Sequence, residues 1–185
     1  MSNENQSERA ATSTRRRQML KHLAEACRLA VLEGVPDLLR GPGLVQQLVV
    51  SDALGHVPCL SYRDGPGDAY LAADPKQRFE YFTALEGRRF QTGMVGDGGR
   101  TSRDDYQKRI LSAAKIFLAV FASGEPLKLL RVYEVEPATV WDKAASQIDK
   151  AAASRANVAL SERWAAEHGR RVFPVAEGGK IDSRS

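Results

Sequence analysis

The sequence predicts a mixed α/β domain, with a central mixed sheet flanked by helices. Two observations predict it. Apolar residues recur at helical spacing in some segments, whereas others are short runs rich in Val, Tyr, Phe and Thr separated by Gly, Pro and Asp. The chain has 185 residues, of which 43% are hydrophobic and 27% charged. This composition excludes collagen, a coiled coil and disorder throughout, and the length suffices to bury a core without disulfides or metals.

The first residues predict a disordered basic arm. Residues 1–14 are rich in Ser, Asn, Glu and Thr and lack apolar periodicity, so we expect disorder over 1–16. We expect a single domain over 17–175 and a flexible tail over 176–185. The formal net charge is +4, and it is concentrated at the two ends. A basic arm adds non-specific affinity for phosphates, here through Arg15, Arg16 and Arg17. The alternative is that the charged ends only keep the protein soluble.

Five segments have the spacing and end signals of helices. Serine and proline stand at expected starts, and glycine stands after expected ends. The residues predict helices over 17–33, 43–54, 101–114, 138–153 and 161–168.

Seven segments read as strands. The first four are separated by short polar connections and predict an antiparallel meander. The almost wholly apolar run 116–122 predicts a central strand. The strands are expected over 57–62, 69–73, 78–84, 88–95, 116–122, 127–135 and 171–174, the last at a sheet edge.

The clearest chemical constellation is a pair of carboxylates on neighbouring strands. Asp68 opens one strand, and Glu80 lies in the next strand after a short turn. Two carboxylates that point into one site suffice for Mg²⁺, which takes oxygen ligands and keeps several waters. Such a site can activate water against a phosphodiester. The alternative is that Asp68 is a turn residue and Glu80 a solvated strand residue.

The order of these elements resembles the PD-(D/E)XK nuclease fold of restriction endonucleases over about residues 20–175. The resemblance implies a magnesium-dependent endodeoxyribonuclease that works on double-stranded DNA as a homodimer, with Asp68 and Glu80 as catalytic and metal-binding residues. The similar stretches are Leu54–His56, Gly67–Tyr70, Phe79–Thr83, Ile116–Phe121, Leu130–Val135 and Ala156–Trp164.

Two positions depart from the family's pattern. The family's Glu-x-Lys places a carboxylate and an ammonium on one face of a strand, because residues i and i+2 share a face. Here Phe82 stands in the lysine position, and Gln47 stands where many relatives have a metal-supporting glutamate. The departures suggest a lapsed catalyst or a displaced cation. The candidates for that cation are Lys76, Lys108, Arg88 and Arg89.

A glycine-rich loop over 93–100 is a candidate DNA contact. Its backbone amides can approach a phosphate, and basic residues flank it. The alternative is a flexible connection between strands. The chain has neither a P-loop nor a strand-linked G-x-G-x-x-G, so nucleotide binding is not expected. The flanking residues are Arg88, Arg89, Arg100 and Arg103.

Three functions therefore remain open from the sequence. The first is a magnesium-dependent DNA nuclease, the second a catalytically lapsed DNA-binding protein of the same fold, and the third a regulatory or assembly protein with no nucleic-acid role. No stretch approaches the ~20 apolar residues of a bilayer span, and residues 1–21 lack the apolar core of a signal peptide. We therefore expect a cytoplasmic protein without a membrane partner.

Overall fold

The computed structural model describes residues 3–32, 42–59, 67–96, 101–151 and 155–174. The chain divides into two compact units, Met1–Pro42 and Gly43–Ser185. The sequence predicted one domain over 17–175, and those bounds stay a prediction, whereas the division of the structure falls at residue 42. Gly34, Pro36, Gly41 and Pro42 cluster in the sequence at the boundary, and such residues do not continue a helix into a following domain.

The described residues of the first unit form helix α1 (Asn3–Leu32). The helix begins at Asn3, whereas the sequence predicted a disordered arm over 1–16 and a helix over 17–33. The first 33 residues of the sequence contain neither Gly nor Pro, and Ala, Glu, Gln and Arg among them favour a helix. Low hydrophobicity predicts the lack of a packed core, but it does not prevent a single helix.

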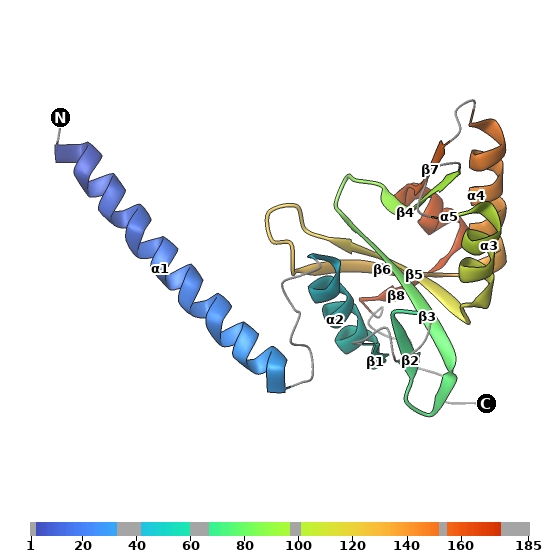
Figure 1. Ribbon diagram of the computed structural model, residues 1–185, viewed down its shortest axis with the longest axis horizontal. Coiled ribbons are helices and arrows are strands. Elements are labelled where there is room, and N and C mark those ends of the chain that lie inside the picture. Colours follow the sequence, from blue (N-terminus) through green and yellow to red (C-terminus); the bar gives the residue numbers. More distant parts are fainter. Residues whose placement is uncertain (1–2, 33–41, 60–66, 97–100, 152–154, 175–185) are drawn as a thin grey trace. The chain divides into compact units, whose positions relative to one another are not determined.

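The second unit is built on a six-stranded mixed sheet in the order β1-β2-β3-β5-β6-β8 (Figure 1). The central neighbours β3 and β5 are parallel, and the other neighbouring pairs are antiparallel. The mixed α/β class is therefore confirmed. The strands are β1 (Val57–Pro58), β2 (Ala69–Leu71), β3 (Asp74–Leu85), β5 (Lys115–Phe121), β6 (Leu129–Val135) and β8 (Arg170–Phe173).

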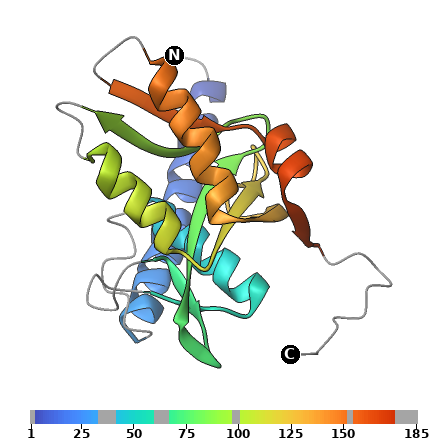
Figure 2. The same cartoon turned by 90° about the vertical axis from the view of Figure 1, so that its right-hand side faces the viewer.

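Alternate residues of β5 divide the core between the two faces of the sheet. Ile116, Leu118 and Val120 contribute to one hydrophobic cluster, whereas Phe117 and Phe121 contribute to the other. The first cluster includes side chains of α3 (Arg103–Ser112), α4 (Pro137–Lys150) and α5 (Glu162–His168), and the second includes α2 (Pro42–Leu54). Helices α3 and α4 lie side by side over their face in both views (Figures 1 and 2). The expected central strand at 116–122 is thus confirmed.

The expected four-stranded meander was wrong in its last member. Strand β4 (Phe90–Gly96) leaves the main sheet and pairs antiparallel with β7 (Arg155–Leu160) in a separate two-stranded sheet. Strand β7 was not predicted, because alanines weaken the alternation of its short segment. Its buried residues nevertheless alternate, since Ala156, Val158 and Leu160 point into the core.

The predicted helix starts are largely confirmed by caps. Ser102 accepts a hydrogen bond from the backbone of Asp105 at the start of α3, and Ser161 does so from Trp164 at the start of α5. Pro137 opens α4, which ends at Lys150. Residues 60–62 of the expected first strand and 152–153 of the expected fourth helix lie outside the described residues. Among the helices that the structure describes, none combines the length and apolarity needed to cross a membrane.

Candidate active site

Asp68, which directly precedes β2, is held by hydrogen bonds of its backbone and of its carboxylate. Its backbone N–H donates to the Phe79 carbonyl oxygen at 2.8 Å. Its carboxylate accepts from the Tyr81 backbone N–H at 2.7 Å through Oδ2, and from Gln47 Nε2 on α2 at 2.8 Å through Oδ1. The two contacts on β3 lie on either side of Glu80 in the sequence. Asp68 is therefore fixed alongside Glu80, and Gln47 orients its carboxylate.

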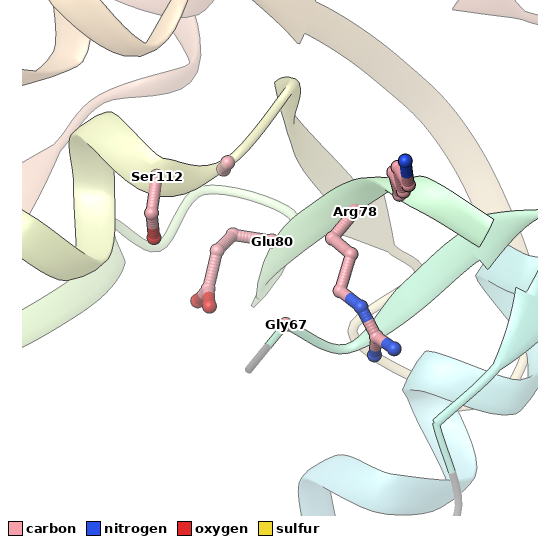
Figure 3. Close-up of a pocket in the computed structure, with 6 residues that line it drawn as sticks. Gly67, Arg78, Glu80 and Ser112 are labelled. Atoms are coloured by element: carbon pink, nitrogen blue, oxygen red, sulfur yellow. The ribbon is translucent and has the colours of Figure 1, made fainter. Parts of the chain in front are cut away.

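Glu80 lies on the face of β3 that α3 covers. Glu80 is 8% exposed, although a carboxylate is rarely buried without a partner. Figure 3 shows its carboxylate pointing from β3 into the space between Ser112 and Gly67. This space, which we call the β3 pocket, has a volume of about 270 Å³. It is lined by Gly67, Lys76, Arg78, Glu80, Ser112 and Ala113.

The two carboxylates, which we call the acidic pair, affect each other electrostatically. Burial, followed by the negative charge of Asp68, raises the pKa of Glu80 to about 7, against the opposing effect of Arg109. Burial also raises the pKa of Asp68, although the Tyr81 N–H and the charge of Arg109 act to lower it. The charge of Asp68 thus acts on Glu80, in a place where ionising both carboxylates is costly. That the two carboxylates form one catalytic site stays a prediction.

Arg109 on α3 provides the cation beside the acidic pair. Its Nε lies 3.9 Å from Glu80 Oε2, and its Nη2 donates to the Thr92 carbonyl oxygen at 2.6 Å. The guanidinium also lies over the rings of Phe82, 5.6 Å from the centroid, and Tyr106, at 5.4 Å. A positive charge therefore occupies the neighbourhood of Phe82, the strand position where the family has lysine.

Sequence reasoning missed Arg109. The residue directly precedes Ile110, which with Tyr106 forms the buried face of α3. A cation beside the apolar stripe of a helix that follows the acidic strand is the signal that could have found it. The signal is weak, because long basic side chains commonly border apolar faces of helices.

The other cations considered from sequence lie in different places. Lys76 lines the β3 pocket with Glu80, whereas Lys108 is exposed on α3. Arg88 and Arg89 are exposed beyond the C-terminal end of β3. Five residues of strand separate Glu80 from that end, a distance of roughly 17 Å at 3.3–3.4 Å per residue. Neither arginine is therefore brought to the acidic pair.

Of the remaining DNA-contact candidates, Arg103 is the one that the structure describes within the second unit. Arg103 pairs with Asp149 on α4 and lies over the Trp141 ring, 5.8 Å from its centroid. Arg100 and residues 97–100 of the glycine-rich loop lie outside the described residues. Arg15 is exposed on α1, in the other unit, and α1 also contains Arg16 and Arg17.

A polar cluster on the opposite face of β3 fixes the strand beside Asp68. The Tyr81 hydroxyl lies 2.7 Å from His56 Nδ1 and accepts from Ser51 Oγ at 3.5 Å. The His56 ring also packs 4.3 Å from the Phe79 ring, measured between centroids. Burial lowers the pKa of His56, which favours the neutral ring. These contacts hold the backbone whose N–H binds the Asp68 carboxylate.

The donor set suits Mg²⁺ better than a transition metal. Within the described ranges, no group of three or more His, Cys, Asp or Glu side chains is placed to hold a metal ion. Mg²⁺ needs only one or two protein carboxylates, because it retains waters. Asp68 and Glu80 can provide these, since each carboxylate oxygen keeps a lone pair when it accepts one hydrogen bond. Gln47 was expected to be a metal ligand. In the structure its amide N–H₂ donates a hydrogen bond to Asp68 instead.

Comparison with known proteins adds no family assignment: no protein-family model matches the chain, and no curated protein matches it in sequence.

Proposed function

We propose that the protein is a DNA phosphodiesterase of the restriction-endonuclease-like fold. The observation that carries the proposal is buried Glu80, which lines the β3 pocket, with the half-buried Asp68 acting on its pKa and Arg109 beside it. A carboxylate as buried as Glu80 costs folding free energy, and strongly perturbed carboxylates in pockets are common at functional sites. The order α2-β1-β2-β3-β4-α3-β5, with β5 parallel to β3, supports the fold assignment.

Each residue of the site has a separate role in the proposed hydrolysis of a phosphodiester. Asp68 and Glu80 would hold Mg²⁺, which when bound supplies Lewis-acid stabilisation of the phosphoryl oxygens. Gln47 and the Tyr81 N–H keep Asp68 in one orientation. Arg109 lies beside Glu80 and offers positive charge to the phosphate as negative charge develops on it. Arg109 thereby takes the part that the family gives to lysine at the Phe82 position.

A catalytically lapsed DNA-binding protein is the second candidate. Phe82 favours it, because this residue is 8% exposed and belongs to the hydrophobic cluster under α3. An apolar side chain that packs in the core does no acid–base chemistry. In this alternative, Arg109 serves to neutralise the acidic pair. For either function we propose a homodimer on double-stranded DNA, in which each protomer faces one strand.

The test is nicking of supercoiled plasmid DNA in Mg²⁺, with binding measured by gel shift in Ca²⁺. We expect wild-type protein to cut, and Glu80→Gln and Arg109→Met each to lower the rate ~100-fold or more. Arg163→Met is the matched control, because Arg163 is exposed on α5 and pairs with Glu167. It should cut at the wild-type rate.

The outcomes separate the candidates. Binding without cutting by the wild type supports the lapsed DNA-binding protein. Cutting that persists in Glu80→Gln contradicts the assignment of the acidic pair. A wild type that neither binds nor cuts DNA contradicts both functions and leaves the regulatory or assembly alternative.

A further inference from the structure

Three charged residues follow one face of β3 at every second position. Lys76, Arg78 and Glu80 alternate with residues of the opposite face, and all three line the β3 pocket. Same-face residues of a strand repeat at roughly 6.6–6.8 Å, twice the rise per residue. This repeat is close to the spacing of successive phosphates along one nucleic-acid strand. A backbone laid along β3 would therefore meet one charged side chain per phosphate.

Arg78 is oriented along this face by its neighbours. Its guanidinium lies over the Tyr70 ring, 5.5 Å from the centroid, and its Nη1 donates to Cys59 Sγ at 3.3 Å. Figure 3 shows the side chains of Arg78 and Glu80 leaving β3 on the side where Gly67 lies. These contacts hold the positive charge of Arg78 on the face of β3 that also carries Glu80.

Gly67 lets the backbone lie close to this face of β3. Its backbone has φ +97°, and a Cβ there would lie 3.1 Å from the Phe79 carbonyl oxygen and 3.3 Å from Arg78 Cβ. A larger residue would be strained and would crowd Arg78. The glycine thus lets the chain pass close to β3 without a side chain beside the pocket.

We propose that Lys76 and Arg78 form a phosphate track, which binds successive backbone phosphates of duplex DNA on one side of the bond that faces Glu80. The inference rests on the proposed function and deepens it, because it names the residues that fix the DNA strand relative to the acidic pair. Lys76, which is exposed at the end of the pocket, meets the more distant phosphate, and Arg78 meets the nearer one. Phosphate contacts of this kind position the DNA without reading its sequence.

The experiment measures the salt dependence of binding by the full-length protein. A fluorescent duplex pool of randomised sequence is titrated in Ca²⁺ at several salt concentrations, and fluorescence anisotropy gives the affinity. Each lost phosphate contact should lower the log–log salt slope by about 0.9. We expect this loss for Lys76→Ala and for Arg78→Gln, and twice the loss for the double variant. Arg78→Lys keeps the charge and should retain the slope.

Lys128→Ala is the matched control, because it removes one exposed positive charge that pairs with Glu125 and does not line the pocket. Its slope should equal that of the wild type. Equal slopes for wild type, Lys76→Ala and Arg78→Gln would overturn the phosphate track, while leaving the nuclease proposal in place if the wild type cuts DNA. Absence of DNA binding by the wild type would overturn the proposed function and the track together.

Arg78→Gln changes the contacts with Tyr70 and Cys59, so its thermal unfolding is compared with that of Arg78→Lys. Lys76→Ala provides an independent reading, because Lys76 is exposed and its loss leaves no buried group unpaired. If Lys76→Ala alone leaves the salt slope of DNA affinity unchanged, the proposal that Lys76 and Arg78 together form the phosphate track is overturned.

Discussion

Asp68 and Glu80 are stabilised in different ways, although they lie side by side. Asp68 accepts two hydrogen bonds, from the Gln47 amide and the Tyr81 N–H, and these favour its ionised form. Glu80 faces the Arg109 guanidinium at the longer distance of 3.9 Å. Glu80 is therefore the member of the acidic pair that we expect to take up a proton near neutral pH.

The raised pKa of Glu80 predicts that the metal-free protein loses stability as pH rises. The native state binds the Glu80 proton more tightly than the unfolded state, so unfolding releases it between the ordinary pKa of 4.5 and about 7. The associated stability is fully present below 4.5 and is lost as pH rises through 7. Glu80→Gln should flatten this decline and be more stable than the wild type at pH 8, by at most about 3 kcal/mol.

Urea unfolding in EDTA across this pH range measures the effect. Glu125→Gln removes an exposed carboxylate and should leave the pH dependence as in the wild type. If the free energy of unfolding depends on pH in the same way for wild type and Glu80→Gln, burial does not shift the pKa of the Glu80 carboxyl.

Gln47 offers a second test at the level of one residue. Gln47→Glu replaces the donor to Asp68 with a third carboxylate, so without metal we expect a loss of about 1–3 kcal/mol at neutral pH. Mg²⁺ should recover more stability in Gln47→Glu than in the wild type, because a carboxylate binds this ion better than an amide. Thermal unfolding with and without Mg²⁺ measures the difference.

Gln46→Glu is the control on the same helix. Gln46 Oε1 accepts from the Thr83 hydroxyl at 2.6 Å, a bond that a carboxylate can also accept. If Mg²⁺ stabilises the Gln46 and Gln47 variants to the same degree, position 47 does not adjoin the metal site.

The sequence predicted Asp68 and Glu80 as neighbours because a short turn between strands dictates which residues meet across them. It did not predict Arg109, because 29 positions separate it from Glu80 and their contact depends on how α3 packs against β3. Contacts within a hairpin follow from local periodicity. Contacts between a helix and a strand require the tertiary arrangement, which a single sequence does not reveal.

At the level of elements, the β4–β7 pair is fastened to the main core through Tyr106. The hydroxyl of this buried α3 residue lies 2.7 Å from Thr92 Oγ1 on β4, and Thr92 Oγ1 donates to the Val158 carbonyl oxygen on β7 at 3.1 Å. Three elements that are distant in the sequence thus share one buried polar contact.

Gly93 allows Tyr106 to approach β4, and this predicts a cost for any larger residue. A Cβ at Gly93 would lie 2.7 Å from Tyr106 Cε2, and the ring is 1% exposed and has little space to move. Gly93→Ala should therefore lower the free energy of unfolding by about 1–3 kcal/mol, measured by urea denaturation. Nothing lies within 4 Å of a Cβ at Gly124, so Gly124→Ala should change it by less than about 0.5 kcal/mol. Equal effects would mean that the β4–α3 contact adjusts freely.

The same contact explains why element prediction failed at β4. Its residues have the composition of a strand, and this much was predicted, but the partner strand β7 comes about 60 positions later along the chain. Composition can identify a strand without identifying its neighbour. The serine and proline signals at helix starts are local, and they were correct for α3, α4 and α5.

For the whole molecule, the division at Pro42 predicts that the second unit is stable without the first. Within the residues that the structure describes, every member of the two hydrophobic clusters lies at or after Val49. Deleting residues 1–41 should therefore change the free energy of unfolding of the second unit by less than about 1 kcal/mol. A cooperative urea transition with the same midpoint as full-length protein would confirm this. Loss of the transition would show that α1 belongs to the folding unit.

The same deletion tests whether α1 contributes to DNA binding. Arg15, Arg16 and Arg17 follow one another in α1 and together carry three positive charges. We expect deletion of residues 1–41 to lower the log–log salt slope of affinity by about one or two units, at about 0.9 per contact. Full-length protein with all three arginines replaced by glutamine should show the same loss, because it keeps the helix and removes only the charge. Equal slopes for wild type, the triple variant and the deletion would assign the arm a solubilising role, and the DNA affinity would then come from the unit that contains β3.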